Sequence, residues 1–419
     1  MKMRETLRSR VVITGLGAIT AIGCSVKELW ERAIKGQSGI RKITQFDASQ
    51  LPCQIAGEIP DFNPYDYLER KEARRIPRSA QIALAAAYQA IQDAALPESM
   101  PEPERVGVVF GTAIGGIDKI DDGIQVLRSQ GYERVSPYIL PSGIPNLPAF
   151  LIANKFRCLG PNSTVTTACA AGTQAIGDAA EMIRREVAEI VICGGTEALI
   201  RDFAIAGFVA MRALPTSYNN SPQKASRPFD ARREGFVFSE GAAALVLENY
   251  DHAVARVAKI YAELAGYASS ADGYHLVVPD PSAMGPSRAM SWALKDAGLQ
   301  PEQVDYINAH GTSTPLNDLN ETKAIKNVFG EHAYHIPISS TKSMIGHAMG
   351  AAGSIEAVIC AMTIKKGWIH PTINYEYPDP ECDLDYVPNE PRKKEVKVAL
   401  SNSFGLGGQN ACIILRGIS

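Results

Sequence analysis

The sequence predicts a layered α/β fold built from two duplicated halves. Short apolar segments typical of strands alternate with helical segments along the chain, and strands run into glycine-rich turns in both halves. The 419 residues suit two domains or one large duplicated domain. We expect the boundary near residue 255, with one half at 1–255 and the other at 256–419.

The elements follow from local patterns, taken in chain order. The run VVIT (11–14) predicts a first strand that ends in a Gly15-Leu16-Gly17 turn. Further strands are expected within 105–116, 189–198, 241–250, 258–270, 304–314 and 397–408. Helices are expected at 78–95, 170–185, 287–297, 319–329 and 353–365. Segments rich in Pro, Asn and Asp predict loops at 214–235, 278–286 and 370–392.

The composition argues against several classes of protein. A net charge of -3 gives no reason to expect nucleic acid as a partner. The eight cysteines are scattered without a CxxC pair, which argues against a zinc site or a disulfide framework and favours the cytoplasm. Gly15-Leu16-Gly17 lacks the third glycine of a dinucleotide-binding motif, and no Walker A sequence occurs. We therefore expect no cofactor and no metal.

The N-terminal segment has a second interpretation. MKMRETLRSR followed by VVITGLGAITAIGC resembles a signal segment with a lipid-attachment cysteine at Cys24. However, glycines and threonines interrupt the apolar stretch, which runs directly into the amphipathic VKELWERAIKG. We favour the strand. No stretch reaches the ~20 apolar residues of a membrane span, so no membrane association is expected.

Cys169 is the first candidate for catalysis. It stands between the β-branched run at 164–167 and the alanine-rich segment AAGTQAIGDAAEMIRRE, so it is expected at or just before a helix N-terminus. Unpaired backbone N–H groups there favour a thiolate, which is the nucleophilic form of cysteine. Small neighbours leave room for a substrate. Taken alone, Cys169 slightly favours the interpretation as a buried inert thiol, because most free cysteines are packing residues.

Three distant segments favour the catalytic interpretation. NAHGTSTP places His310 at the end of a strand, and STKSMIGHAMGAAG places His347 before a glycine- and alanine-rich helix, five residues after Lys342. SNSFGLGGQN places Phe404 before a glycine loop. A nucleophilic cysteine with two histidines at strand or helix ends is a recognisable catalytic set.

With these motifs the sequence resembles the β-ketoacyl-[acyl carrier protein] synthases, most closely the elongating type II class of the thiolase superfamily. The resemblance begins at VVITGLG, passes through TACA, GGTEA, RPFDARREGFVFSEGA, INAHGTST and TKSMIGHAMGAAG, and ends at NSFGLGG. It implies a thiolase-like α/β/α/β/α fold. The Cys-His-His set distinguishes this class from thiolases, which use a second cysteine, and from initiating synthases, which have asparagine at the second histidine position.

The resemblance implies a Claisen condensation in ping-pong order. An acyl group moves from a carrier protein's phosphopantetheine to Cys169; malonyl-carrier protein then loses carbon dioxide, and its carbanion attacks the acyl-cysteine. Neutral His310 and His347 would stabilise the enolate, with a helix terminus keeping His347 neutral. The backbone N–H groups of Cys169 and Phe404 would form a second oxyanion hole. Lys342 would order the site and pair with Glu356, or form a purely structural ion pair with it.

Further positions match the family. Thr312 and Thr314 would hydrogen-bond the pantetheine arm, although turn-stabilising hydroxyls are the simpler interpretation. Ile114 and Phe208 match positions that line the acyl pocket, or are ordinary core. Phe404 resembles an aromatic gate on a glycine hinge, although the usual GFGG is GLGG here.

The expected partner is an acidic acyl carrier protein. ERKEARRIPR (69–78) has five basic residues against two acidic ones, and Arg70, Lys71, Arg74 and Arg212 match carrier-facing positions, although an ordinary solvated face is an equal possibility. We expect a homodimer or, alternatively, a heterodimer with a related ketosynthase-like subunit. Two other functions stay open: a ketosynthase of a type II polyketide or specialised-lipid pathway, and a non-catalytic chain-length partner subunit.

Overall fold

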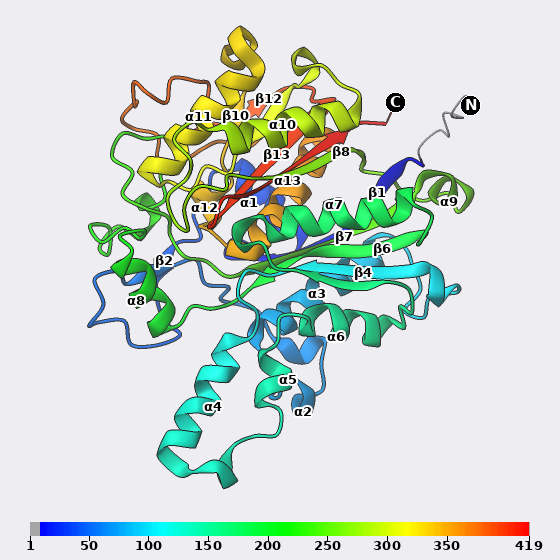
Figure 1. The fold of residues 1–419 in the computed structure, drawn as a ribbon, viewed down its shortest axis with the longest axis vertical. Helices are drawn as coiled ribbons and strands as arrows, with labels where there is room; N and C mark the ends of the chain where they lie inside the picture. The colour runs from blue at the N-terminus through cyan, green and yellow to red at the C-terminus, as the bar shows by residue number, and fades with distance from the viewer. Residues whose placement is uncertain (1–8, 419) are drawn as a thin grey trace.

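Helices and strands alternate in five layers in the computed structural model, which describes residues 9–418 (Figure 1). Two halves of one ten-stranded sheet are separated by a central helical layer and covered by helices outside. The predicted layered α/β fold is confirmed. Segment 1–8, the charged part of the signal-like interpretation, lies outside the described residues.

The sheet repeats one strand order twice. The amino-terminal half runs β5 (Asn162–Val165), β4 (Val106–Gly111), β6 (Ile190–Glu197), β7 (Gly241–Asn249), β1 (Val11–Thr20). The other half runs β10 (Ile338–Ser339), β9 (Tyr306–Asn308), β13 (Val398–Gly405), β14 (Gln409–Arg416), β8 (Ala262–Ala271). In each half the first three strands are parallel and the last three antiparallel. The expected duplication is confirmed in this topology; the boundary at residue 255 stays a prediction.

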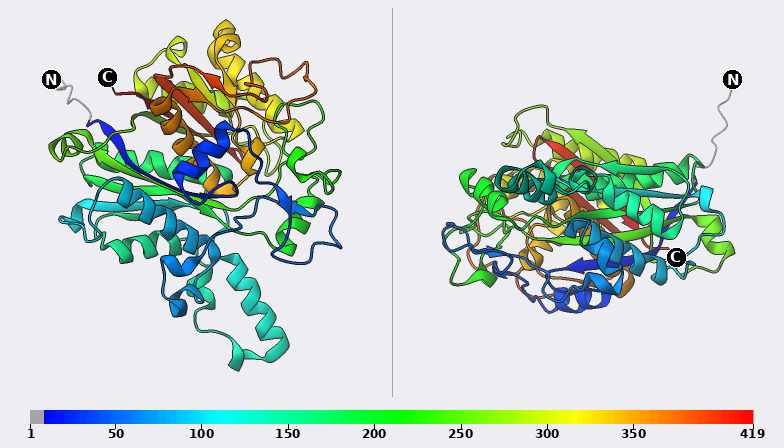
Figure 2. Two further views of the ribbon diagram at one scale, coloured as in Figure 1. Left: turned by 180° about the vertical axis from the view of Figure 1, so that it is seen from behind. Right: turned by 90° about the horizontal axis from the view of Figure 1, so that it is seen from below.

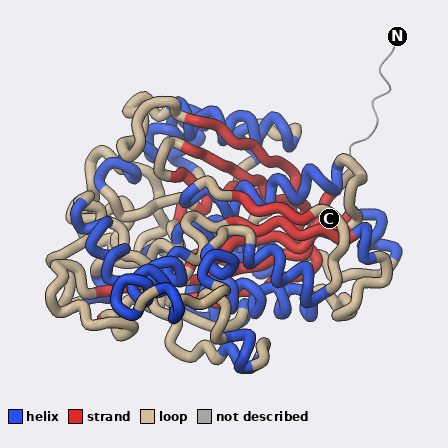
Figure 3. Tube along the Cα trace, turned by 60° about the horizontal axis from the view of Figure 1, so that its bottom comes forward, coloured by secondary structure: helices blue, strands red, loops and turns tan. Residues whose placement is uncertain are grey.

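Long helices form the other three layers. Helices α3 (Arg78–Asp93) and α6 (Leu147–Phe156) cover the amino-terminal half sheet, while α10 (Met284–Ala297) and α11 (Pro315–Phe329) cover the other. Helices α7 (Ala171–Arg184) and α13 (Ala352–Lys366) lie between the two half sheets (Figure 2). Figure 3 shows the strands side by side with helices around them.

The remaining elements are shorter or peripheral. Helices α4 (Ile117–Gln130) and α5 (Ile139–Gly143) form a lobe that projects from the body at the bottom of Figure 1. The others are α1 (Val26–Ile34), α2 (Arg70–Ala73), α8 (Asp202–Ala210), α9 (Tyr250–Ala255), α12 (Lys342–Ile345) and the small sheets β2 (Arg41–Lys42)/β3 (Ile55–Ala56) and β11 (Trp368–Ile369)/β12 (Arg392–Lys393).

The central helices approach each other closely because their first turns are made of small residues. Every residue of α13 from Ala352 to Thr363 is buried, as expected of a helix enclosed on all sides. A Cβ added at Gly172 would lie 2.8 Å from the Gly350 carbonyl oxygen, so only glycine permits this approach. The glycines next to the two catalytic motifs therefore bring the halves of the molecule together.

The predicted Gly15-Leu16-Gly17 turn is wrong. Strand β1 continues to Thr20 with only a bulge between Ile13 and Gly15. The glycines are needed because a Cβ at Gly17 would overlap the Ala86 carbonyl of α3. Strand β1 pairs with β7 and β8 at the centre of the sheet, so the strand predicted from Val11 is confirmed.

The five helices expected from the sequence are confirmed, with small differences at their ends. Two begin three or four residues earlier than predicted, α10 at Met284 and α11 at Pro315, where the Thr314 side chain caps the helix. In the described part of the chain, no helix combines the length and hydrophobicity that crossing a membrane requires.

Candidate active site

Cys169 lies in a single 3₁₀ turn, Ala168–Ala170, directly before α7. This is the expected position, after β5 and at a helix N-terminus. The preceding Ala168 has φ 49°, a left-handed conformation that costs a non-glycine residue roughly 1–2 kcal/mol. The turn therefore holds the sulfur in a fixed direction, and only 4% of the residue is exposed.

The two histidines come from the other half of the molecule and meet the cysteine. His310 follows β9, and His347 follows α12. The Nε2 atom of His347 lies 3.0 Å from Cys169 Sγ, and the imidazole centroids are 5.4 Å apart. Side-chain ligand atoms of all three residues lie within 4.8 Å of one another. The structure thus assembles the predicted set in one place.

Lys342 determines which nitrogen of His310 carries the proton. Its Nζ lies 3.3 Å from His310 Nδ1 and forms a buried ion pair with Glu356 on α13. An ammonium group can only donate hydrogen bonds, so Nδ1 accepts. A neutral His310 must then carry its proton on Nε2, which makes that atom a hydrogen-bond donor.

Both imidazoles are neutral. Burial lowers the pKa of His310 and of His347 well below the ordinary histidine value, and the nearby Lys342 charge lowers each further. For His347 the expected direction is confirmed, but burial and Lys342 are the cause here, rather than the helix terminus that the sequence suggested.

The expected thiolate at Cys169 is wrong. Burial raises the pKa of the thiol to about 12, while the Lys342 charge and a backbone hydrogen bond from Leu406 favour the thiolate less strongly. The sulfur is therefore protonated at neutral pH. It becomes a nucleophile only when its proton moves, and His347 Nε2 lies within reach of that proton.

The backbone N–H that reaches the sulfur belongs to Leu406, two residues beyond the predicted Phe404. Phe404 lies within β13, where it pairs with Asn410 of β14. Its ring instead packs edge-on against His310, with centroids 5.6 Å apart. The oxyanion hole predicted for the N–H groups of Cys169 and Phe404 stays a prediction.

One cavity of 310 Å³ opens onto this site. Its lining includes the following predicted residues: Cys169, Phe208, Arg212, His310, Thr312, Thr314, His347 and Phe404. The hydroxyls of the two threonines are 2.9 Å apart, so they form one polar patch on the wall. Ile114 is not part of the lining; it packs against the hydrophobic cluster that contains Cys169.

The four residues predicted to dock the carrier protein do not lie together on the surface of the molecule. Arg70, Lys71 and Arg74 are exposed on or directly after α2, whereas Arg212 follows α8 at the cavity wall. Figure 1 shows α2 and α8 well apart.

Two buried carboxylates that sequence reasoning missed hold the site loops. Glu321 accepts the backbone N–H groups of His310 and Gly311 at 2.8 and 2.7 Å, and burial raises its pKa to about 7. Glu197 accepts the N–H groups of Ala113 and Gly350, and burial raises its pKa to about 7 as well. The sequence feature that could have indicated these two residues is an acidic residue in a buried element, such as Glu197 at the end of β6.

The sulfur and two imidazoles are also spaced as metal ligands, a grouping found within residues 9–418. However, the Lys342 ammonium at His310 Nδ1 is a fixed positive charge that opposes a bound cation. The donor set therefore fits proton transfer and anion stabilisation better.

Comparisons with known proteins agree with this geometry. A model of the β-ketoacyl synthase amino-terminal domain matches residues 8–253, and that of the carboxy-terminal domain matches residues 261–376. A 3-oxoacyl-[acyl-carrier-protein] synthase 2 of Synechocystis sp. is 49% identical over 99% of this chain and 99% of that protein. A Staphylococcus aureus protein of the same name is 48% identical over 97% of this chain and 98% of its own.

Solved structures agree as well. A type II polyketide ketosynthase, in complex with its acyl-carrier protein and bound to the hexaketide, superposes with a TM-score of 0.90 at 38% identity, covering 98% of this chain and 100% of its own. A β-ketoacyl synthase from Burkholderia phymatum gives a TM-score of 0.90 at 36% identity with the same coverage.

We predict that His310 and His347 stay neutral from about pH 8 to about pH 6, across the ordinary histidine pKa of about 6.5. Lowered pKa values mean that protonation begins only at more acidic pH. ¹⁵N-histidine NMR titration checks this, with His310→Asn and His347→Asn to assign the signals. An imidazole of either residue that titrates near 6.5 would contradict the prediction.

Proposed function

Because this chain belongs to the β-ketoacyl synthase family, we propose that it condenses acyl groups with malonyl-carrier protein in fatty acid elongation. The reaction releases carbon dioxide and gives a β-ketoacyl-carrier protein two carbons longer. The observation that carries this function is a buried thiol within reach of two neutral imidazoles in one cavity.

In the first half-reaction, Cys169 Sγ attacks the carbonyl carbon of the acyl thioester. A new C–S bond forms, and the thiol proton moves to His347 Nε2. The C–S bond to the pantetheine then breaks, and its sulfur takes the proton from His347. The backbone N–H groups of Cys169 and Phe404 are the proposed donors to the oxyanion that forms between these events.

In the second half-reaction, the bond between the malonyl carboxylate and its methylene carbon breaks. Carbon dioxide leaves, and the electron pair becomes a thioester enolate. His310 donates its Nε2–H to the enolate oxygen because Lys342 occupies Nδ1. His347, whose Nε2 is bare after the first half-reaction, joins as a second donor once its proton has exchanged from Nδ1 to Nε2 through solvent. The carbanion attacks the acyl-cysteine, the C–S bond to Cys169 breaks, and the sulfur takes up a proton from solvent.

The cavity wall provides positions for the rest of the substrate. Thr312 and Thr314 offer adjacent hydroxyls to the amides of the pantetheine arm. Phe208 at the wall and Ile114 behind it give the acyl chain an apolar surface. This chemistry uses side chains and backbone groups of the chain alone, so the proposal includes no cofactor. With eight free cysteines, a reducing cytoplasmic location suits the protein.

The alternative functions are less well supported. The relatives named for 3-oxoacyl-carrier synthesis are 49% and 48% identical, whereas the polyketide ketosynthase is 38% identical. A non-catalytic chain-length subunit has no need of a nucleophile, yet here Cys169 is in contact with His347.

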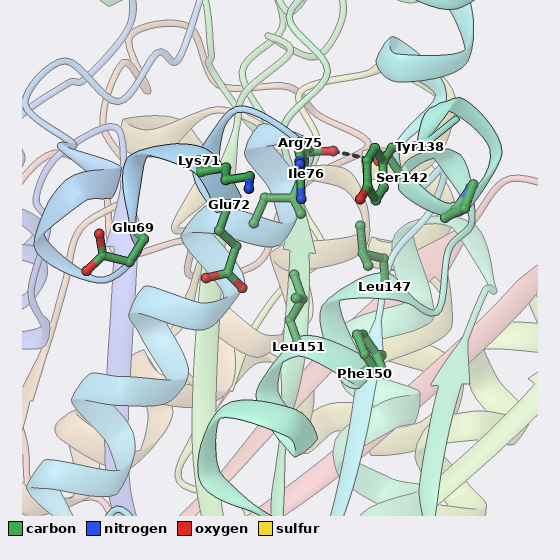
Figure 4. Close-up of a pocket in the computed structure, with 11 residues that line it drawn as sticks. Glu69, Lys71, Glu72, Arg75, Ile76, Tyr138, Ser142, Leu147, Phe150 and Leu151 are labelled. Carbon is green, nitrogen blue, oxygen red and sulfur yellow. Dashed lines mark hydrogen bonds between the residues drawn. The ribbon is translucent and has the colours of Figure 1, made fainter. Parts of the chain in front are cut away.

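The carrier protein is expected to dock on α2. Arg70, Lys71 and Arg74 present three exposed positive charges there, which suit an acidic partner. Beside them is a groove of 480 Å³, drawn in Figure 4, with Lys71 on one side and Phe150 on the other. Its apolar floor offers contact area for a carrier helix. Arg212 at the active-site cavity suits the phosphate of the incoming arm.

The projecting lobe suits a second copy of this chain. Several large apolar side chains are exposed there, among them Tyr132 and Leu140 at 76% and 67%, and such a group suits an interface. Strand β5 nearby is an edge strand with an unpaired row of backbone groups. We therefore assign a homodimer.

Cys169→Ala should form no acyl-enzyme and no elongated product, while malonyl-carrier protein is still decarboxylated. His310→Ala and His347→Ala should each lower decarboxylation on the order of 100-fold, since one donor to an oxyanion contributes ~3 kcal/mol. Mass spectrometry after incubation with malonyl-carrier and acyl-carriers of graded length measures both steps. Elongation by Cys169→Ala, or near-normal decarboxylation by both histidine variants, would refute the assignment.

Charge reversal should separate carrier docking from chemistry. Lys71→Glu with Arg74→Glu should raise KM for acyl-carrier protein roughly tenfold at low salt, less at high salt, with kcat toward a short pantetheine thioester unchanged. Lys366→Glu, an exposed charge at the end of α13, is the matched control. Equal KM values for both variants would move the docking site elsewhere.

Sedimentation equilibrium of the purified chain should give twice the chain mass. Leu140→Glu should lower the mass toward that of the monomer because a charge would be buried in the interface. Val257→Glu, on an exposed residue outside the lobe, should leave the dimer intact. A monomeric wild-type chain would argue for the heterodimer instead.

A further inference from the structure

His370 is a buried histidine that the condensation does not use. It follows β11, is fully inaccessible, and is absent from the lining of the active-site cavity. Its Nδ1 lies 2.9 Å from the Pro371 carbonyl oxygen. A carbonyl only accepts, so Nδ1 carries a proton. Burial lowers the pKa of His370 to about 4, so the ring is neutral and its Nε2 is a bare acceptor.

Four polar groups surround that single acceptor. The Oγ1 atom of Thr341 lies 3.0 Å from His370 Nε2, Asn308 Nδ2 3.4 Å, Ser339 Oγ 3.4 Å and Tyr306 Oη 3.5 Å. These groups also bond to one another: Asn308 Nδ2 donates to Tyr306 Oη at 3.0 Å and to Thr341 Oγ1 at 3.1 Å. All four residues are buried. Together with His370 they form a closed polar cluster.

The cluster joins the two segments that carry catalytic groups. Asn308 ends β9, two residues before His310, and Thr341 directly precedes Lys342 at the start of α12. No residue of the cluster lines the active-site cavity. The contact between Lys342 Nζ and His310 Nδ1 spans these same two segments. The backbone pairing of β9 with β10 and the Asn308–Thr341 contact hold these segments together, and His370 Nε2 is the acceptor that both side chains share.

We propose that His370 is a positioning residue for the decarboxylation step: its Nε2 aligns the end of β9 with the start of α12, so that Lys342 meets His310. The inference rests on the proposed function, in which His310 donates to the enolate. Acyl transfer does not use His310; it depends on Cys169, which lies outside the cluster, and on His347, which follows α12 and serves both half-reactions. Loss of the acceptor should thus affect one half-reaction more than the other.

A matched pair of variants tests the role of the acceptor. Asparagine places its amide near Nδ1, keeping the donor to Pro371 but not the central acceptor; glutamine places an amide oxygen near Nε2. His370→Asn should lower malonyl decarboxylation roughly tenfold and change the rate of acyl-enzyme formation less than twofold. His370→Gln should recover most of the decarboxylation. Carbon dioxide release and intact-protein mass measure the two steps.

A milder pair covers the case in which His370 variants do not fold. Thr341→Val deletes the shortest contact to Nε2 and should lower decarboxylation about threefold with acyl transfer intact. Thr363→Val is the control, because its buried hydroxyl has no hydrogen-bond partner, and it should leave both steps unchanged.

The outcomes are distinguishable from those for the proposed function. If the wild-type chain forms no β-ketoacyl product, the function itself fails. If wild type condenses but Thr341→Val and His370→Asn slow both half-reactions equally, in step with a lower melting temperature, His370 is only structural and the inference is overturned. A constant ratio of the two rates in His370→Gln and His370→Asn would also overturn it.

Discussion

The close crossing of the two central helices is the constraint on which the site depends. The nucleophile belongs to one half of the chain and both imidazoles to the other, so no local segment can assemble them. Gly172 and Gly350 leave no side chain between the start of α7 and the turn before α13. This brings Cys169 Sγ to 3.0 Å from His347 Nε2. A methyl group at that crossing would move these two reactive atoms apart without changing either reactive group.

Burial of the site determines the protonation states of its titratable groups. Burial away from solvent disfavours the thiolate of Cys169 and the imidazolium of both histidines, so every reacting group is neutral before the reaction. Lys342 and Glu356 form the buried ion pair beside the site, and burial raises the pKa of Glu356 to about 7 despite the Lys342 charge. Removing one partner of such a buried pair costs about 3–5 kcal/mol, which suits the two residues to orienting the site.

Much of this was predictable from local sequence, because strand and helix patterns and small-residue runs are local signals. The turn at Cys169, the positions of His310 and His347, and the Lys342–Glu356 pair all agree with expectation. The protonation state of the Cys169 thiol was not predicted correctly. Local sequence shows that the residue stands at a helix terminus, but not which distant segments bury it. Leu406 was missed because hairpin register decides which N–H faces the sulfur. In the same way, Gly17 was misread as a turn because its partner lies on α3.

Clusters such as that around His370 are harder still to predict. Their members come from strands, loops and a helix start spread over more than sixty positions, and each alone is an unremarkable polar residue. Only the backbone arrangement shows that they share a single acceptor.

The seam between the half sheets is short: β1 and β8 pair through Val12 with Glu263 and Ile13 with Ala262. The few hydrogen bonds between β1 and β8 are not enough by themselves to hold the two half sheets together. The halves cohere instead because each supplies one wall around α7 and α13. Either half on its own would expose a broad apolar face to water. Each half of this chain therefore needs the other to keep its inner sheet face and the helices α7 and α13 away from water.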